Sequence, residues 1–138
     1  MLKTKLTLMF ILCNILLACA PYPVYKTTKL EANFLVLDAN KKHIEGAKIV
    51  LNTHARATPI NEFNIQYTNA KGMTNFASKK EMQVENTGVH GALDYFWDLC
   101  IEKTGFKTFN KHIENASELS GPQVINLVPG KSESCVTR

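Results

Sequence analysis

The stretch Tyr95-Phe-Trp-Asp-Leu-Cys-Ile-Glu102 decides the fold class of this chain. Large apolar side chains occupy every second position, and Asp98 and Glu102 lie on positions between them. Because successive side chains of a β-strand point to opposite faces of its sheet, this alternation predicts a strand with one buried face. The predicted buried row is Tyr95, Trp97, Leu99 and Ile101.

Alternation with the same period recurs along the chain, whereas helical periodicity is nearly absent. Turn-forming residues at 38–41, 69–72 and 103–105 separate the alternating segments. We therefore expect an all-β sandwich. The further predicted rows are Leu30, Ala32, Phe34 and Val36; Ala47, Ile49 and Leu51; Phe109, Lys111 and Ile113; and the short final run Val124–Val128.

Two polar stretches, at 53–64 and 77–92, do not fit this pattern. Loops longer than about 12–15 residues are uncommon unless they are functional or disordered. We expect both stretches to be loops, and loops on a rigid scaffold commonly carry function. They contain His54, Arg56 and His90, which are the predicted contact residues for a partner.

The first 18 residues have the composition of a secretory signal. Lys3 and Lys5 precede an apolar run from Leu6 to Leu17. A basic start, an apolar segment of about 7–15 residues and a small-residue cleavage site define such signals, whereas a membrane-spanning helix needs about 20 apolar residues. We expect removal of residues 1–18, with an uncleaved anchor as the alternative.

The end of that run, Leu16-Leu-Ala-Cys19, resembles the lipobox of bacterial lipoproteins. The resemblance implies cleavage before Cys19 and attachment of several acyl chains there, which together give stable membrane anchoring. By the sorting preference of enteric bacteria, Ala20 implies the outer membrane, with the domain in the cell envelope facing the periplasm. The alternative is an ordinary signal peptide with an incidental cysteine. Residues 19–29 contain two prolines and no apolar periodicity, so they are predicted to form a tether.

Removal of the signal leaves a nearly balanced charge and two cysteines. Without Lys3 and Lys5 the 16 basic residues become 14, against 12 acidic ones, so the net charge of +2 gives no indication of nucleic-acid binding. Cys100 and Cys135 would then lie in a compartment where disulfides persist. A bridge closing this loop of about 35 residues contributes about 3–4 kcal/mol in the chain-entropy model. Two unpaired thiols are the alternative.

Four segments in order resemble carboxypeptidase regulatory-like domains. They are Leu37–Val50, with an Asp-led turn and a Gly-Ala pair; Thr68–Gly72 followed by Phe76; Glu102–Phe106; and Ile125–Pro129. The resemblance implies an antiparallel prealbumin-like or Ig-like β-sandwich of about seven strands over 30–130, followed by a tail at 131–138. It also implies a non-catalytic binding or spacer role. The sequence departs from the family's turns at Lys41, His43 and Asn69.

Motifs for catalysis or metal binding are missing from the sequence. The histidines at 43, 54, 90 and 112 show neither an i, i+4 pair nor the close Cys/His spacing of a zinc site, so we expect no metal and no cofactor. A hydrolase related to transthyretin uses His and Arg on a similar fold, but its Tyr-Arg-Gly-Ser signature does not occur here. An enzyme would require His54, Arg56 or His90 to converge in a pocket.

Five aromatic side chains gather in the second half of the chain: Tyr95, Phe96, Trp97, Phe106 and Phe109. We expect them to form the core, because aromatic side chains dominate protein cores. The alternative is a partly exposed patch that binds a partner. Asp98 is expected on the solvated face of its strand.

The leading functional hypothesis is a membrane-anchored envelope lipoprotein that binds or spaces a protein or a cell-wall component without catalysis. A second hypothesis is an accessory lipoprotein of a trans-envelope secretion or assembly machine. A transthyretin-related hydrolase is the third.

Overall fold

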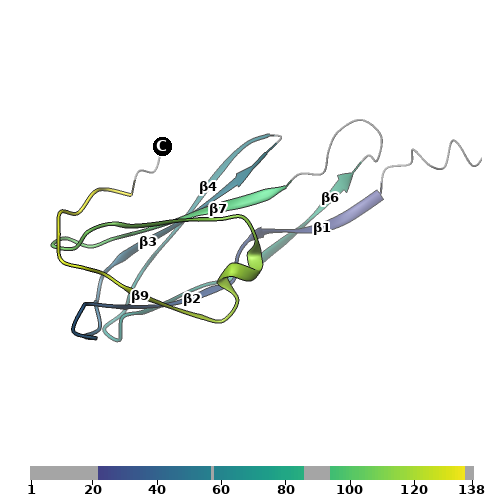
Figure 1. The fold of residues 1–138 in the computed structure, drawn as a ribbon. Helices are drawn as coiled ribbons and strands as arrows, with labels where there is room; N and C mark the ends of the chain where they lie inside the picture. Colours follow the sequence, from purple (N-terminus) through teal and green to yellow (C-terminus); the bar gives the residue numbers. More distant parts are fainter. Residues whose placement is uncertain (1–21, 57, 86–93, 136–138) are drawn as a thin grey trace, which may run out of the picture. The chain divides into compact units, whose positions relative to one another are not determined.

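The computed structural model describes residues 22–56, 58–85 and 94–135 of the chain (Figure 1). These ranges contain nine strands and one 3-10 helix, and no helix in them is long and apolar enough to cross a membrane. Cys19 and His90 lie outside the described residues. The elements are β1 (Tyr22–Lys29), β2 (Ala32–Leu37), β3 (Lys48–Ala55), β4 (Thr58–Tyr67), β5 (Met73–Phe76), β6 (Lys79–Glu85), β7 (Tyr95–Glu102), β8 (Phe109–Ile113), η1 (Ala116–Leu119) and β9 (Pro122–Asn126).

The described residues belong to two compact units. The larger unit contains 27–80 and 94–135, and the smaller one contains 22–26 and 81–85. Strands β1 and β6 pair with each other in a two-stranded sheet.

Two sheets build the larger unit (Figure 1). One has the order β4-β3-β7-β8 and is antiparallel throughout. The other has the order β5-β2-β9, in which β5 runs antiparallel to β2 and β9 runs parallel to it. The parallel pair differs from the fully antiparallel sandwich expected. It arises because the chain crosses from β8 through η1 before β9 joins the other sheet, and a parallel neighbour requires such a crossover.

Side chains from both sheets enclose one apolar core, and the predicted rows supply most of it. Burying each such side chain contributes about 1.5–3 kcal/mol. Phe34 and Phe76 meet edge to face, with ring centroids 5.8 Å apart. The core residues are Leu30, Ala32, Phe34, Val36, Ile44, Ala47, Ile49, Leu51, Phe76, Trp97, Leu99, Ile101, Ile113, Leu119 and Leu127, with Tyr95, Phe106, Phe109 and Ile125 partly buried against them.

Turn chemistry fixes where β2, β3 and β5 begin and end. The Asp38 carboxylate accepts hydrogen bonds from the backbone of Asn40 and Lys42, and the Asn69 side chain does the same for Lys71 and Met73. Such side-chain bonds stabilise tight turns. Lys41 has a φ of 63°, a left-handed conformation that residues other than glycine adopt uncommonly.

Three predicted loops or tethers contain strands instead. Residues 53–64 form the β3–β4 hairpin rather than a loop, and 77–92 contains β6. Residues 19–29, expected to lack regular structure, contain β1. The strand total therefore exceeds the seven expected. In β4 the side chains opposite the buried row of β3 are the polar Glu62, Asn64 and Gln66. This strand therefore has no inward apolar row by which the sequence could have predicted it.

Candidate functional site

The candidate site lies on the outer face of the β4-β3-β7-β8 sheet. This is the face turned away from the core. The β-sheet register defines this face, because residues directly opposite each other share a side of the sheet. It consists of Asn61, Phe63, Ile65 and Tyr67 from β4; Lys48, Val50, Asn52 and His54 from β3; Phe96, Asp98, Cys100 and Glu102 from β7; and Asn110 and His112 from β8.

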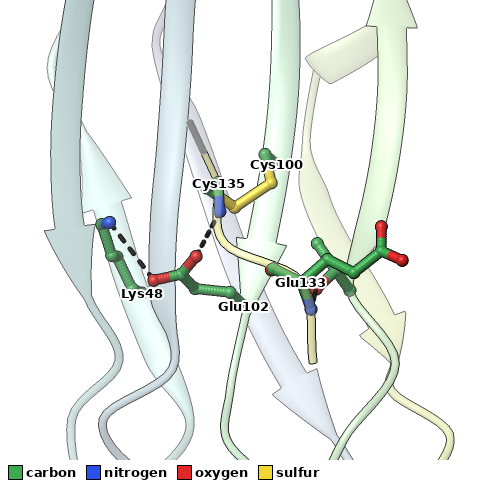
Figure 2. The surroundings of a disulfide bond; sticks show 6 residues. Lys48, Cys100, Glu102, Glu133 and Cys135 are labelled. Carbon is green, nitrogen blue, oxygen red and sulfur yellow. Dashed lines mark hydrogen bonds and ion pairs between the residues drawn. A yellow bond between two sulfur atoms is a disulfide. The ribbon is translucent and has the colours of Figure 1, made fainter. Parts of the chain in front are cut away.

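A C-terminal strap, residues 131–135, covers the middle of this face (Figure 2). Cys135 forms a disulfide with Cys100, with Cα atoms 5.8 Å apart, so the expected bridge is present. Val50 lies opposite Cys100 and is only 3% exposed although it is on the outer side of the sheet. The strap therefore shields the middle of the outer sheet face, and residues 131–135 are not a loose tail.

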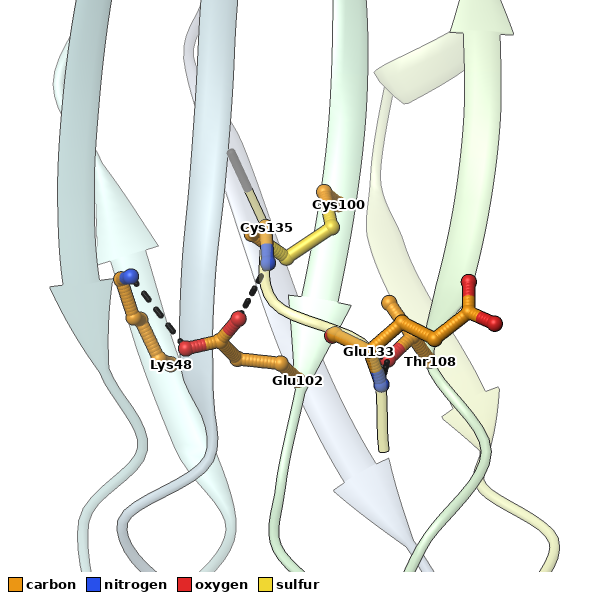
Figure 3. Close-up of polar contacts among 6 residues, drawn as sticks. All are labelled: Lys48, Cys100, Glu102, Thr108, Glu133 and Cys135. Carbon is orange, nitrogen blue, oxygen red and sulfur yellow. Dashed lines mark hydrogen bonds and ion pairs between the residues drawn. A yellow bond between two sulfur atoms is a disulfide. The ribbon is translucent and has the colours of Figure 1, made fainter. Parts of the chain in front are cut away.

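Hydrogen bonds hold the strap at its middle residue and at Cys135 (Figure 3). The backbone N–H of Cys135 donates to the Glu102 carboxylate, whose other oxygen lies 3.2 Å from Nζ of Lys48. The Thr108 hydroxyl donates to the carbonyl of Glu133 at 2.5 Å and accepts from its N–H at 2.7 Å. The strap is thus fixed to β7 and to the segment entering β8.

Beside the strap, Asp98 lies between two histidines, and we call His54, Asp98 and His112 the His–Asp–His cluster. Nε2 of His54 is 2.9 Å from one carboxylate oxygen, and Nδ1 of His112 is 2.7 Å from the other. All three side chains are a quarter to a half exposed, and ion pairs at this exposure contribute only about 0–1 kcal/mol each. Stability alone is therefore a weak reason for the cluster.

Phe96 packs between the two histidine rings. Its ring stacks on His54 with centroids 5.0 Å apart and lies 5.4 Å from the ring of His112. The Asn52 side-chain amide approaches Nε2 of His54 to 2.9 Å, while Asn52 Oδ1 is buried and has no hydrogen-bond partner in the described part of the chain. The ring of His54 is therefore contacted on its face by Phe96 and at Nε2 by both Asp98 and Asn52.

A groove of about 310 Å³ lies between the cluster and the strap. Its wall combines amides, an imidazole, a carboxylate and apolar surface, the mixture that orients a bound molecule. Within the described ranges no three His, Cys, Asp or Glu side chains converge on a point where a metal ion would fit. The lining residues are Val50, Asn52, His54, Phe63, Asp98, Cys100, Asn110, Ser134 and Cys135.

The predicted contact residues are distributed unequally around this groove. His54 lines it, but from strand β3 and not from a loop. Arg56 lies exposed at the hairpin turn and is not part of the lining. Asp98 lies half-exposed on the outer face, as expected, but Asn52 and His112 were not predicted as site residues beside it. The only signal for them was their shared outward parity on β3, β7 and β8, which becomes informative once the register is known.

The five aromatic side chains also divide. Trp97 is buried in the core, and Tyr95, Phe106 and Phe109 pack against it, as expected. Phe96 instead faces outward between the histidines, so one member of the group lies on the candidate binding face.

No protein-family model, no curated protein and no solved structure matches this chain. The resemblance to carboxypeptidase regulatory-like domains and to the lipobox therefore stays a prediction, and the function is inferred from the residues and their geometry.

Proposed function

We propose that this protein is a lipoprotein of the bacterial cell envelope, anchored through Cys19, that binds a partner on the outer face of its β4-β3-β7-β8 sheet without catalysing a reaction. The observation that carries the proposal is the groove between the strap and the His–Asp–His cluster. A sheet face that only contacts solvent requires neither a disulfide-bonded strap across it nor two histidines in contact with one carboxylate.

The groove is built on a rigid scaffold, which favours binding. Its wall residues come from the four neighbouring strands of an antiparallel sheet and from the strap, which is fixed by a disulfide and three hydrogen bonds. A preformed site loses little conformational entropy when it binds a partner.

The chemistry of the groove favours binding over hydrolysis. A hydrolytic triad needs a nucleophile hydrogen-bonded to the histidine. Ser134 lines the groove with His54 and Asp98, but within the described residues no hydrogen bond joins its hydroxyl to His54. One nitrogen of each histidine ring is already in contact with the Asp98 carboxylate, which holds both rings in a fixed orientation.

We also propose that the sandwich is prealbumin-like. The Asx turn at Asp38, the positive φ of Gly46 before the start of β3 and the positive φ of Gly72 before β5 support this assignment. The partner is then a protein or a cell-wall polymer within reach of a lipid-tethered domain, and the outer membrane facing the periplasm is the proposed location.

A photo-crosslinking residue at Asn110 in intact cells tests the proposal, because Asn110 is exposed and lines the groove. The control is the same residue at Val124, which is 53% exposed on the other sheet. We expect a discrete crosslinked product from position 110 and none from 124. Equal products at both positions, or no product at either, would reject the groove as the binding site.

The anchor is tested separately with Cys19→Ala. We expect this change to move the protein from the membrane fraction to the soluble envelope fraction with its thermal unfolding midpoint unchanged. Retention in the membrane fraction would count against lipid anchoring.

A further inference from the structure

The edges of the two sheets in the larger unit are protected to very different degrees. β5 has four residues, and β9 has five and begins with Pro122. β8 has five residues, including Lys111 and His112. β4 has ten residues, pairs only with β3 among the described strands, and carries Glu62 as its single charged side chain. Long edge strands without charges attract another strand, so β4 is the edge most open to pairing.

The outward side chains of β4 make this edge more unusual. Phe63, Ile65 and Tyr67 form an apolar row on the outer face, and the exposed fractions of Ile65 and Tyr67 are 38% and 61%. Outward positions of a sandwich strand are normally polar. Between them lie the uncharged amides of Asn64 and Gln66.

We propose that two copies of the chain pair antiparallel through β4, with the two-fold axis at Ile65. In this register each Phe63 lies opposite Tyr67 of the second copy, the two Ile65 side chains meet, and each Asn64 lies opposite Gln66. Aromatic and β-branched cross-strand pairs stabilise antiparallel sheets. A register centred on Phe63 places Tyr67 opposite Pro59, and one centred on Asn64 places Tyr67 opposite Asn61. In both registers part of the apolar row lacks an aromatic or β-branched partner.

The pattern identifies a second copy of this chain as the occupant because the edge is complementary to itself. A two-fold contact uses the same patch on both subunits. Here the apolar row of one copy packs against the same row of the second copy. Each Glu62 lies opposite Thr68 of the second copy, so the two carboxylates are not opposite each other. The resulting eight-stranded sheet presents both grooves on one face. This inference depends on β4 alone and holds whether or not the proposed anchor and groove ligand are correct.

The first test is the molar mass of the full-length protein, measured by light scattering with the detergent contribution subtracted. We expect a dimer for the wild type and for Val124→Lys, an exposed substitution on the other sheet. Ile65→Lys places two ammonium groups at the axis, and we expect it to be a monomer with the wild-type unfolding midpoint. A monomeric wild type, or a dimer that persists in Ile65→Lys, would overturn the proposal.

The second test does not depend on how well the lysine variant folds. Ile65→Cys places two thiols at the two-fold axis, and we expect mild oxidation of the purified full-length protein to give a disulfide-linked dimer that a reductant reverses. Val124→Cys is the control and should remain monomeric on a non-reducing gel. No dimer from position 65, or an equal amount from position 124, contradicts the pairing. Neither outcome affects crosslinking at Asn110, so the two proposals can fail independently.

Discussion

At the scale of single residues, Gly72 is held between two parts of the backbone. Its φ is 69°, and a Cβ at this position would lie 2.6 Å from the carbonyl oxygen of Val36. Gly105 has a φ of 88°, but a Cβ there would meet nothing within 4 Å. The two glycines therefore separate the cost of a left-handed backbone from the cost of a steric clash.

We expect Gly72→Ala to destabilise the protein by about 2–4 kcal/mol and Gly105→Ala by about 1–2 kcal/mol, the strain of the left-handed conformation alone. Urea unfolding of both variants measures the difference. Equal losses would mean that the contact with Val36 relaxes without cost.

Thr68 is the second residue whose side chain decides local structure. Its buried hydroxyl donates to the carbonyl of Ile44 at 2.7 Å and accepts from the N–H of Ala47 at 2.8 Å. Thr68→Val keeps the shape and leaves both backbone groups unpaired, so we expect a loss of about 2–4 kcal/mol. Thr74→Val is the matched control, since Thr74 makes no side-chain hydrogen bond within the described ranges and should change stability little.

At the scale of elements, the short helix η1 depends on Glu118. Hydrogen bonding from the backbone N–H of Asn115, together with the Lys111 side chain and the N–H of Glu114, lowers the pKa of Glu118 below 4.5. A carboxyl with a lowered pKa in the folded state stabilises the protein above its unfolded pKa, and this contribution is lost as the pH falls through the folded pKa.

We therefore expect wild type to be more stable than Glu118→Gln at neutral pH, with the difference shrinking as the pH falls below about 4.5. Unfolding curves at several pH values measure this difference. A gap that widens toward acid pH would contradict the assigned cause.

The strands also show what the sequence can and cannot predict. β2, β3 and β7 alternate apolar inward residues with others, so their buried rows were predicted correctly. β4 and β6 place apolar residues such as Ile65, Tyr67 and Met82 in solvent, so a search for buried rows passes over them. The cluster was hidden for a related reason. His54 and Asp98 are 44 residues apart, and only the β3–β7 register brings them together.

At the scale of the whole molecule, the disulfide links the strap to β7. Its loop of about 35 residues should stabilise the fold by about 3–4 kcal/mol. We expect a reductant to lower the free energy of unfolding of the wild type by this amount. The double variant Cys100→Ser/Cys135→Ser should start at the lower value and not respond to the reductant. A wild type that is insensitive to complete reduction would mean that hydrogen bonds alone hold the strap.

We expect the parallel pairing of β2 with β9 to form late in folding. The β3–β4 hairpin joins neighbours in the sequence, whereas Asn33 must find Pro122. Closing so long a loop costs conformational entropy before any stabilising contact forms. Folds dominated by such contacts take milliseconds to seconds to form. Until β9 arrives, one side of β2 stays open to any neighbouring chain. Pairing with another chain is therefore a hazard during folding, before β9 has joined β2. We expect the yield of refolded protein to be highest at low protein concentration.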